Sequence, residues 1–286
     1  MSYLFLRQAE VIVGDSSEAL LITGLRVYFQ IKKSRLAEPN KGEVHIYNLA
    51  ESTRAKIENE FTKIIINAGY KGQVAQVFFG DIRNVFHQIE DENAITKIYI
   101  EDGGNGWQNG IVNQTIGSGV SLKDTVIRLA QTFTNVSIGT LNGLDQGKVN
   151  NDDIAFSGAT KDVLNHLAST YNFNWSIQDN IFETVANNGA TTTQDQAFIV
   201  SSQTGMIGSP SLTEIGINVK TLFNNRLLPN RYINVKAASF DASDDNTAYN
   251  NSKKTNYQGN YLINAVTHTF DTRGDEGSSF IECRRP

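Results

Sequence analysis

Apolar and polar residues alternate over most of the first hundred positions of the chain. Several runs have the two-residue period of a half-buried β-strand. Turn residues separate these runs at short, regular intervals, which is typical of a β-sandwich or β-barrel. We therefore predict a β-rich domain over residues 1–102, with strands near 11–13, 25–31, 44–47, 63–68, 73–80, 83–88 and 95–101.

One short helix is predicted within this β-rich domain. Asn48 and Glu51 have the spacing of a capping box, in which the Asn side chain accepts from the backbone and the Glu side chain reaches back. Ile57 on this helix is expected to face the core. Upstream, the segment from Pro39 to Gly42 predicts a turn, because Pro suits the second turn position and Gly accepts a positive φ.

The period of the pattern changes after a glycine-rich patch at residues 102–106. Apolar residues then recur at helical spacing, with Ser121 as the N-cap of one helix and a second helix beginning near Thr160. A short strand is expected around 136–138, and a polar loop over 141–156. Phe173, Trp175 and Ile177 alternate again and precede a turn at Asp179-Asn180. These features predict a small α+β insert over residues 103–186.

The last hundred residues return to strand periodicity. After a polar linker at 187–196, strands are expected over 215–219, 232–237, 259–268 and 279–284. The polar segment from Ala238 to Asn260 has little that it can bury. We interpret it either as a hairpin tip that orders on assembly or as a solvated loop. The fold class is thus mainly β, with two β-barrel or sandwich domains (1–102 and 187–286) flanking the insert.

Composition narrows the function classes. The chain has 286 residues, of which 40% are hydrophobic and 19% charged, so it can bury a core in each of two or three domains. The net charge of −5 argues against a general nucleic-acid-binding surface. A single cysteine, Cys283, excludes an internal disulfide and a cysteine-cluster metal site. No signal-peptide pattern or membrane-length apolar run is present, so synthesis and folding in a cytoplasm are expected.

Residues with chemical potential are scattered. The histidines lack zinc-motif spacing and are interpreted as structural or surface residues; they are His45, His87, His166 and His268. Neighbouring acids are expected in turns, although a glycosidase pair is defined by space and not by sequence; they are Asp91-Glu92, Glu101-Asp102, Asp152-Asp153 and Asp244-Asp245. We predict no catalytic, cofactor-binding or metal-ligating residue and no cofactor.

Three further residue types have structural interpretations. Cys283 is expected to be a buried thiol. Trp107 and Trp175 are expected to anchor a core or an interface. The segment from Gly103 to Gly106 lacks the Lys-Ser/Thr of a phosphate loop and is predicted to be a flexible junction that does not enter a helix.

Two groups of motifs resemble the baseplate hub proteins of contractile phage tails. The first comprises FQIKKS, EPNKGEVHIYNLAESTR, INAGY and VFFGDI in the N-terminal region. The second comprises IGSP, the strand ending in RYINVK, and GNYLINAVTH near the C-terminus. The resemblance covers more than half of the chain, and its N-terminal part is the more specific.

This resemblance implies a structural, non-enzymatic protein of the virion tail. It implies a homotrimer whose two β domains per chain resemble tail-tube subunits. Three chains then match a sixfold tube above and a threefold central spike below, with tape-measure and wedge proteins as further partners and DNA only in transit. Two similar β domains in each chain solve a symmetry mismatch, because three chains with one such domain each cannot match the six subunits of a tube ring.

Two functions from other classes are alternatives. A tail-associated peptidoglycan hydrolase needs a carboxylate pair in a cleft. A glycan-binding module needs exposed aromatics on a sheet face, for which Tyr28, Tyr47 and Tyr99 are candidates that also suit an intersubunit seam. The apolar segments 64–66, 76–79 and 215–219 are expected inside the sheets, since open apolar edges promote aggregation.

Overall fold

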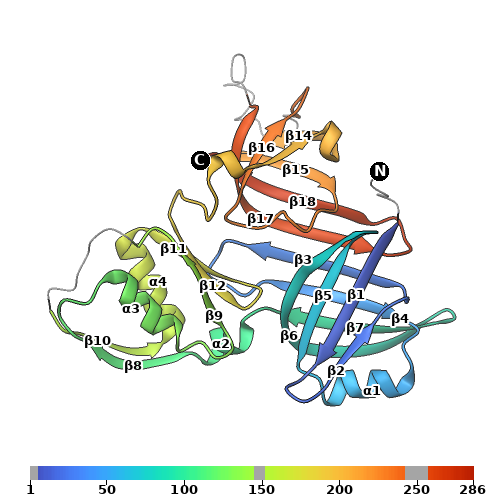
Figure 1. The fold of residues 1–286 in the computed structure, drawn as a ribbon, viewed down its shortest axis with the longest axis horizontal. Coiled ribbons are helices and arrows are strands. Elements are labelled where there is room, and N and C mark those ends of the chain that lie inside the picture. The colour runs from blue at the N-terminus through green and yellow to red at the C-terminus, as the bar shows by residue number, and fades with distance from the viewer. Residues whose placement is uncertain (1–5, 145–151, 242–256) are drawn as a thin grey trace.

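The computed structural model describes residues 6–144, 152–241 and 257–286. Strands dominate the architecture, and a smaller mixed insert lies to one side of them (Figure 1). Within the described residues, no helix is both long enough and apolar enough to cross a membrane.

In the described part of the chain, one mostly antiparallel sheet of thirteen strands forms the body of the molecule. Its main path runs β14-β15-β18-β17-β3-β4-β7-β6-β5-β1-β2, and β16 pairs with both β13 and β17. Its N-terminal strands are β1 (Arg7–Gly14), β2 (Ala19–Ile22), β3 (Val27–Ser34), β4 (Lys41–Tyr47), β5 (Lys63–Tyr70), β6 (Gln73–Glu90) and β7 (Asn93–Glu101). Its C-terminal strands are β13 (Phe198–Ser201), β14 (Met206–Leu212), β15 (Gly216–Leu222), β16 (Tyr232–Lys236), β17 (Gly259–Asp271) and β18 (Gly277–Arg284).

The N-terminal and C-terminal strands meet where β17 pairs with β3. Ala265 lies opposite Ser34, and Phe270 lies opposite Phe29. The other edge of β17 pairs with β18 over the same stretch. Because these ladders are continuous, the two β regions form one hydrogen-bonded sheet. The division into domains at residues 102 and 187 stays a prediction. Three hydrophobic clusters lie mainly in the N-terminal region, the insert and the C-terminal region.

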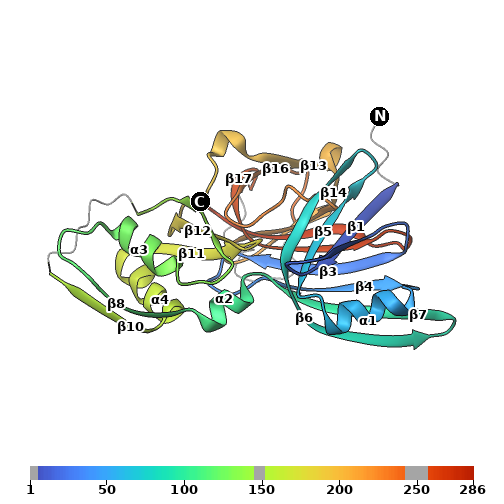
Figure 2. The same cartoon turned by 60° about the horizontal axis from the view of Figure 1, so that its bottom comes forward.

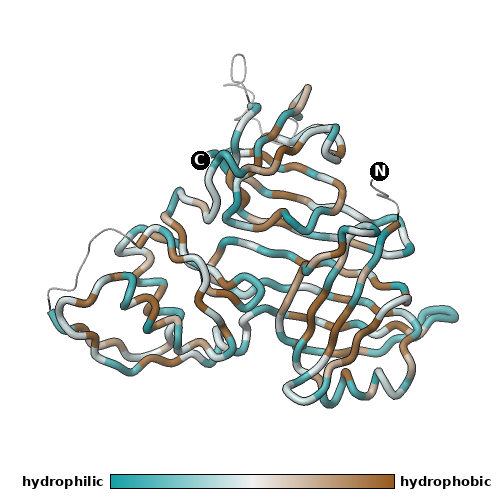
Figure 3. Tube along the Cα trace, viewed as in Figure 1, coloured by the Kyte–Doolittle hydropathy of each residue, from teal (hydrophilic) through white to brown (hydrophobic). Residues whose placement is uncertain are grey.

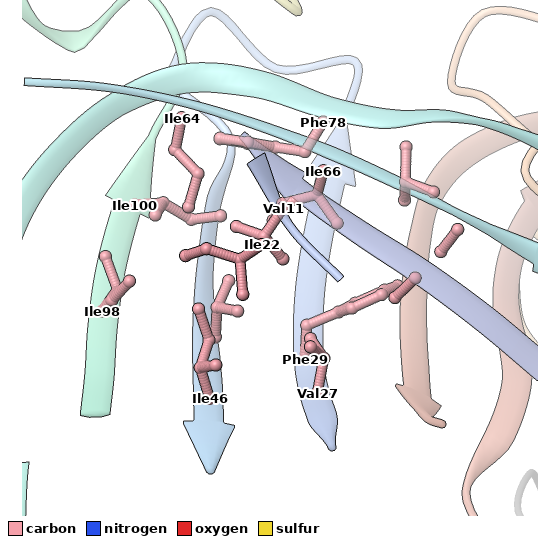
Figure 4. Close-up of a cluster of buried hydrophobic side chains, with 14 of the residues drawn as sticks. Val11, Ile22, Val27, Phe29, Ile46, Ile64, Ile66, Phe78, Ile98 and Ile100 are labelled. Carbon is pink, nitrogen blue, oxygen red and sulfur yellow. The ribbon is translucent and has the colours of Figure 1, made fainter. Parts of the chain in front are cut away.

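Strand β6 corrects the prediction of two separate strands at 73–80 and 83–88. It is one strand of 18 residues that pairs with β5 in its first half and with β7 in its second. A register shift between Ile82 and Asn84 lets it turn from one layer to the other. Figure 4 shows the resulting core, in which Val11 and Ile66 from one layer face residues such as Phe29 of the other.

Helix α1 (Glu51–Asn59) forms where it was expected and buries Ile57, but the predicted capping box is wrong. The N-cap is Ala50, and it makes no side-chain cap. Asn48 instead has a φ of 59° and accepts a hydrogen bond from the backbone of Ala94 at 3.0 Å. Left-handed backbone suits Asn, and this conformation turns its side chain toward the β6–β7 hairpin. The predicted turn at Pro39 also ends earlier than expected, because Lys41 already belongs to β4.

Within residues 103–144 and 152–186, the insert contains three helices, a two-stranded sheet and a three-stranded sheet. These elements are α2 (Gly104–Asn109), β8 (Ile111–Ile116), α3 (Leu122–Ala130), β9 (Ser137–Leu141), β10 (Ile154–Ala159), α4 (Thr160–Tyr171), β11 (Phe173–Gln178) and β12 (Ile181–Ala186). The Ser121 cap is confirmed, since its Oγ accepts from the backbone of Asp124 at 3.1 Å. The β8–β10 pair was missed, because its outward residues interrupt any clear alternation.

Two expectations for the insert are wrong. The segment from Gly103 to Gly106 is not a loose junction, because Gly104 begins α2 and both Gly104 and Gly106 are buried. A Cβ at Gly103, whose φ is +59°, would meet Ile177 at 2.6 Å. The polar loop predicted for 141–156 is shorter, because β9 and β10 occupy its two ends.

In the C-terminal region, Ile217 and Val219 on β15 are buried as predicted, and so are Ile233 and Val235 on β16. Ile215 differs, because β15 begins at Gly216 and leaves Ile215 63% exposed. Strand β14 was not predicted. The apolar segments of β5, β6 and β15 each lie between two neighbouring strands, which confirms that they are covered within the chain.

Candidate anchoring junction and assembly surfaces

A buried ion pair fixes the insert to the large sheet. Every second residue of β3 from Val27 to Lys33 faces inward. Lys33 is the last of them, and its side chain is fully buried. Its Nζ lies 2.8 Å from Oδ1 and 2.6 Å from Oδ2 of Asp179, in the β11–β12 turn. Oδ1 of Asp179 also accepts from the backbone of Phe79 on β6 at 3.0 Å. One turn of the insert therefore contacts two strands of the sheet.

The carboxylate of Asp102 lies beside this ion pair and is fully buried. It accepts from the backbone N of Asn40 at 2.7 Å, from Asn40 Nδ2 at 2.8 Å and from the backbone N of Asp179 at 2.8 Å. Desolvation raises the pKa of Asp102 to about 7, while the hydrogen bonds from Asn40 and the charge of Lys33 act in the opposite direction. The group therefore titrates near neutral pH in the folded protein.

Asn40 and Asn180 complete this anchoring junction, which comprises Lys33, Asn40, Asp102, Asp179 and Asn180. Asn40 Nδ2 also lies 3.0 Å from the backbone O of Ile177. Asn180 Oδ1 accepts from the backbone N of Gly103 at 2.6 Å. The interpretation of Glu101-Asp102 as turn residues with local hydrogen bonds is wrong for this pair, because Glu101 binds Arg83 at 2.9 Å and Asp102 binds across the junction.

The remaining acidic neighbours are less engaged with the core. Asp91 has a φ of 53° and lies in the tight β6–β7 turn, as expected. Asp153 Oδ1 accepts from the backbone of Ser118 at 2.7 Å in a loop. Asp244-Asp245 lies outside the described residues, as does most of the segment from Ala238 to Asn260.

His268 is buried in the C-terminal region and serves the structure. Its Nδ1 lies 2.9 Å from Oγ of Ser279, and its Nε2 lies 3.2 Å from the carbonyl of Leu227. Burial lowers the pKa of His268 to about 3, with a smaller contribution from Lys33. The ring is therefore neutral, and it donates to Leu227 while it accepts from the hydroxyl.

The other histidines are dispersed. His45 packs against Tyr28 with ring centroids 5.1 Å apart, His87 lies on β6, and His166 lies on α4. In the parts of the chain that the structure describes, no three His, Cys, Asp or Glu side chains form a group that could hold a metal ion. Cys283 is buried as expected, and burial raises the pKa of its thiol.

Both tryptophans belong to the insert. Trp175 packs in its core against Phe133 and Phe182, with ring centroids 5.8 and 5.6 Å away. Trp107 reaches the β3–β4 loop, where its Nε1 donates to the carbonyl of Ala37 at 3.0 Å. The expectation of core or interface anchors is confirmed for both.

The β6–β7 hairpin carries exposed apolar side chains. It extends past α1 at the edge of the molecule (Figure 2), and its tip is hydrophilic (Figure 3). Behind this tip, Ile89 is 78% exposed and Phe86 is 54% exposed. Phe86 packs edge-on against Tyr99, with ring centroids 5.8 Å apart. By contrast, Tyr28 and Tyr47 are half-buried and have partners on the same sheet face.

The fold of the chain is similar to those of solved phage tail proteins. The chain is similar to the tail protein from Neisseria meningitidis MC58, with a TM-score of 0.63 and 10% identity over 97% of this chain and 96% of that chain. It is also similar to the 43 kDa tail protein of prophage MuSo2 from Shewanella oneidensis, with a TM-score of 0.64 and 10% identity over 98% of each chain. At this identity the likeness establishes the fold alone.

A third similar structure is the E. coli c3393 protein, a component of the type VI secretion system. The TM-score is 0.57 and the identity 10%, over 91% of this chain and 73% of that chain. The sequence model of the baseplate hub gp41 family matches residues 8–239. The chain therefore belongs to this family of structural baseplate hub proteins. No curated protein matches it.

Proposed function

We propose that this hub protein is a trimeric adaptor that joins a sixfold tail tube to a threefold central spike. The observation that supports this most directly is the pairing of β17 with β3, which joins two β regions into one sheet. Each region has a hydrophobic cluster, and Phe223 and Phe270 of the C-terminal region pack in the N-terminal one. Three copies of such a chain offer six β regions while they keep threefold symmetry. Tape-measure and wedge proteins are further partners, and the protein acts in the tail baseplate after synthesis in the host cytoplasm.

The exposed apolar side chains of the β6–β7 hairpin fit this role as a seam between copies. Phe86 packs against Tyr99 on one face of this projecting hairpin, and Ile89 is exposed on the other face; exposed apolar side chains of this kind mark interaction sites. Burial of aromatic residues also provides much of the binding energy in protein interfaces. In the assembled ring, the net charge of −5 discourages DNA from adhering to the channel wall as it passes.

The adaptor acts without catalysis. The buried carboxylates of the body are already engaged, Asp81 with Lys63, Glu101 with Arg83, and Asp102 with backbone and amide donors. A hydrolase needs one such group free to exchange a proton with substrate. A peptidoglycan zymogram is therefore expected to show no clearing. Clearing that disappears when a single carboxylate is changed would contradict this part of the proposal.

Light scattering over a concentration series tests the assembly. We expect a species of three times the 31.6 kDa of one chain, which becomes more populated at higher concentration and with the spike protein present. A chain that stays monomeric under all these conditions, or that closes as a dimer, would refute the adaptor role.

A further inference from the structure

A cavity of about 560 Å³ lies where the β3–β4 loop, the β17–β18 hairpin and β11 meet. It is separate from the projecting hairpin and opens beside the anchoring junction. The side chains of Arg35, Arg284 and Asn264 line it, with Lys32, Lys41 and Glu38 also in its wall. With Glu282, the lining has four cationic and two acidic residues in a chain whose net charge is −5, so the local charge is opposite to that of the whole protein.

Arg35 is buried in the wall of this cavity with unused hydrogen-bonding capacity. The residue is only 6% exposed. Its Nη2 donates to the carbonyl of Asn187 at 3.1 Å, whereas its Nη1 is buried and has no hydrogen-bond partner. Buried polar groups without partners are rare, because each costs free energy of desolvation that nothing repays.

Arg284 approaches the same point from β18. Its Nη2 donates to the same carbonyl of Asn187, and its Nε is buried without a partner. Neither guanidinium forms an ion pair with a carboxylate of the described residues. Desolvation, with a smaller effect of the nearby Arg284 charge, lowers the pKa of Arg35 to about 10. Two like charges are thus held close together in a partly desolvated position, which an anion between them would stabilise.

Asn264 supplies a third group without a partner. Ile263 lies opposite Cys283 and Ala265 opposite Glu282, so Asn264 is the extra residue of a β-bulge in β17. Bulges redirect side chains and are frequent beside functional sites. Its Oδ1 is buried without a partner. Rotation of the amide by half a turn would present its NH₂ group at that position instead.

We propose that the Arg35–Arg284 pocket binds an oxyanion, a carboxylate or a phosphate-type group, between the two guanidiniums and the Asn264 amide. Guanidinium groups bind such oxygens through two parallel N–H donors, and charge-assisted hydrogen bonds of this kind are stronger than neutral ones. The rim cations are already neutralised in part, Lys32 by Glu282 at 3.6 Å and Lys41 by Glu101 at 3.8 Å. The two arginines are the groups left for a ligand.

The cavity is larger than one oxyanion needs, so the anionic group can be carried on a free small molecule or on an acidic segment of another polypeptide. Separate titrations of the full chain distinguish these sources. The probes are inorganic phosphate, glutarate, and an acidic peptide with its Glu residues intact or replaced by Gln, all at ionic strength fixed with chloride. Binding is followed by calorimetry and by the NMR signals of the arginine Nε–H groups.

We expect saturable binding of at least one of these probes, accompanied by shifts of the Arg35 and Arg284 signals. Binding of phosphate or glutarate indicates a free anion, and binding of the acidic peptide alone indicates a partner chain. Arg284→Gln is expected to weaken the binding at least tenfold. Arg273→Gln, which changes an exposed arginine that donates to the carbonyl of Gly24, is the matched control and leaves it unchanged.

A second variant tests the pocket even where Arg284→Gln fails to fold. Asn264→Asp places a carboxylate in the wall of the cavity that both guanidiniums line, so it is expected to raise the melting temperature without ligand and to abolish probe binding. If no probe binds beyond the effect of chloride, or if Asn264→Asp lowers the melting temperature and leaves binding intact, the proposal is wrong.

Discussion

Nζ of Lys33 lies 2.6 Å from Oδ2 of Asp179, and this ion pair joins the sheet to a residue of the insert that is 146 positions further along the chain. Both groups lie where water is largely excluded, since the exposed fractions of their side chains are 0% and 17%. Removal of one charge from such a pair leaves the other buried without compensation.

Asp179→Asn is therefore expected to lower the free energy of unfolding by about 3 kcal/mol. The Asn side chain keeps an oxygen that can accept from the backbone of Phe79, and Asn tolerates the φ of 53° at this turn position. The lost stability therefore measures the contribution of the charge. Urea denaturation measures it. The matched control is Glu18→Gln, which breaks the exposed pair with Lys56 and is expected to cost less than about 1 kcal/mol. Similar losses in both variants would contradict this prediction.

The buried carboxylate of Asp102 predicts a pH dependence of stability. Its pKa is raised from 3.8 to about 7 in the folded protein, so between these values the folded state holds a proton that the unfolded state has lost. The contribution of Asp102 to stability is full below about pH 4 and is lost as the pH rises toward 7. His268, whose pKa is lowered from 6.5 to about 3, acts in the opposite direction, because its contribution is lost as the pH falls.

Comparison with Asp102→Asn isolates the carboxylate from His268. The free energy of unfolding is measured from pH 4 to pH 8 for both proteins. The difference, original protein minus variant, is expected to decrease as the pH rises to 7 and then to level off. A difference that is constant over this range would show that Asp102 does not titrate there.

Phe270 is predicted to stabilise both β regions together. Its ring lies 5.3 Å from that of Phe29 and 4.5 Å from that of Phe223, measured between centroids. Phe270→Ala is expected to cost about 3 to 5 kcal/mol, because it opens a cavity at the centre of this cluster. Phe280→Ala, at a position 40% exposed on β18, is the control and is expected to cost far less. Equal midpoints in urea for the two variants would disprove the central role of Phe270.

The projecting hairpin is predicted to affect assembly and not folding. Ile89→Asp adds a charge at an apolar side chain that is 78% exposed on this hairpin, so it is expected to weaken trimer formation while it changes monomer stability by less than about 0.5 kcal/mol. Light scattering at matched concentrations measures the effect. Ile111→Asp, at a position 71% exposed on β8, is the control. A normal trimer with Ile89→Asp, or an equal defect in the control, would place the seam elsewhere.

The sequence predicted the strands whose alternation is regular, and it failed where tertiary contacts override a local signal. Asn48 has the spacing of a cap, yet its side chain binds across to Ala94 because the hairpin there offers a free donor. The glycines after Asp102 suggested flexibility, but they are required for close approach to Ile177 and Glu101.

The anchoring junction was also missed, although one of its signals was visible. Lys33 occupies the inward register of β3 behind Phe29 and Ile31, where a charged residue needs a buried partner. The sequence alone does not identify that partner, because Asp179 is distant in the chain and lies in a turn where Asp is common for local reasons. Similarly, Arg35 and Arg284 are brought together only by the pairing of β17 with its neighbours.

The position of β17 in the chain has a consequence for synthesis of the protein. Phe29 and its partner Phe270 are separated by 240 intervening residues, and β3 keeps an open edge until β17 emerges from the ribosome. The first strands can pair among themselves early, but their core stays without its Phe223 and Phe270 side chains until nearly the whole chain has been made. Ribosome-bound chains that stop before residue 259 therefore expose an unpaired strand and an unfinished core, and completion of the fold waits for the last hairpin.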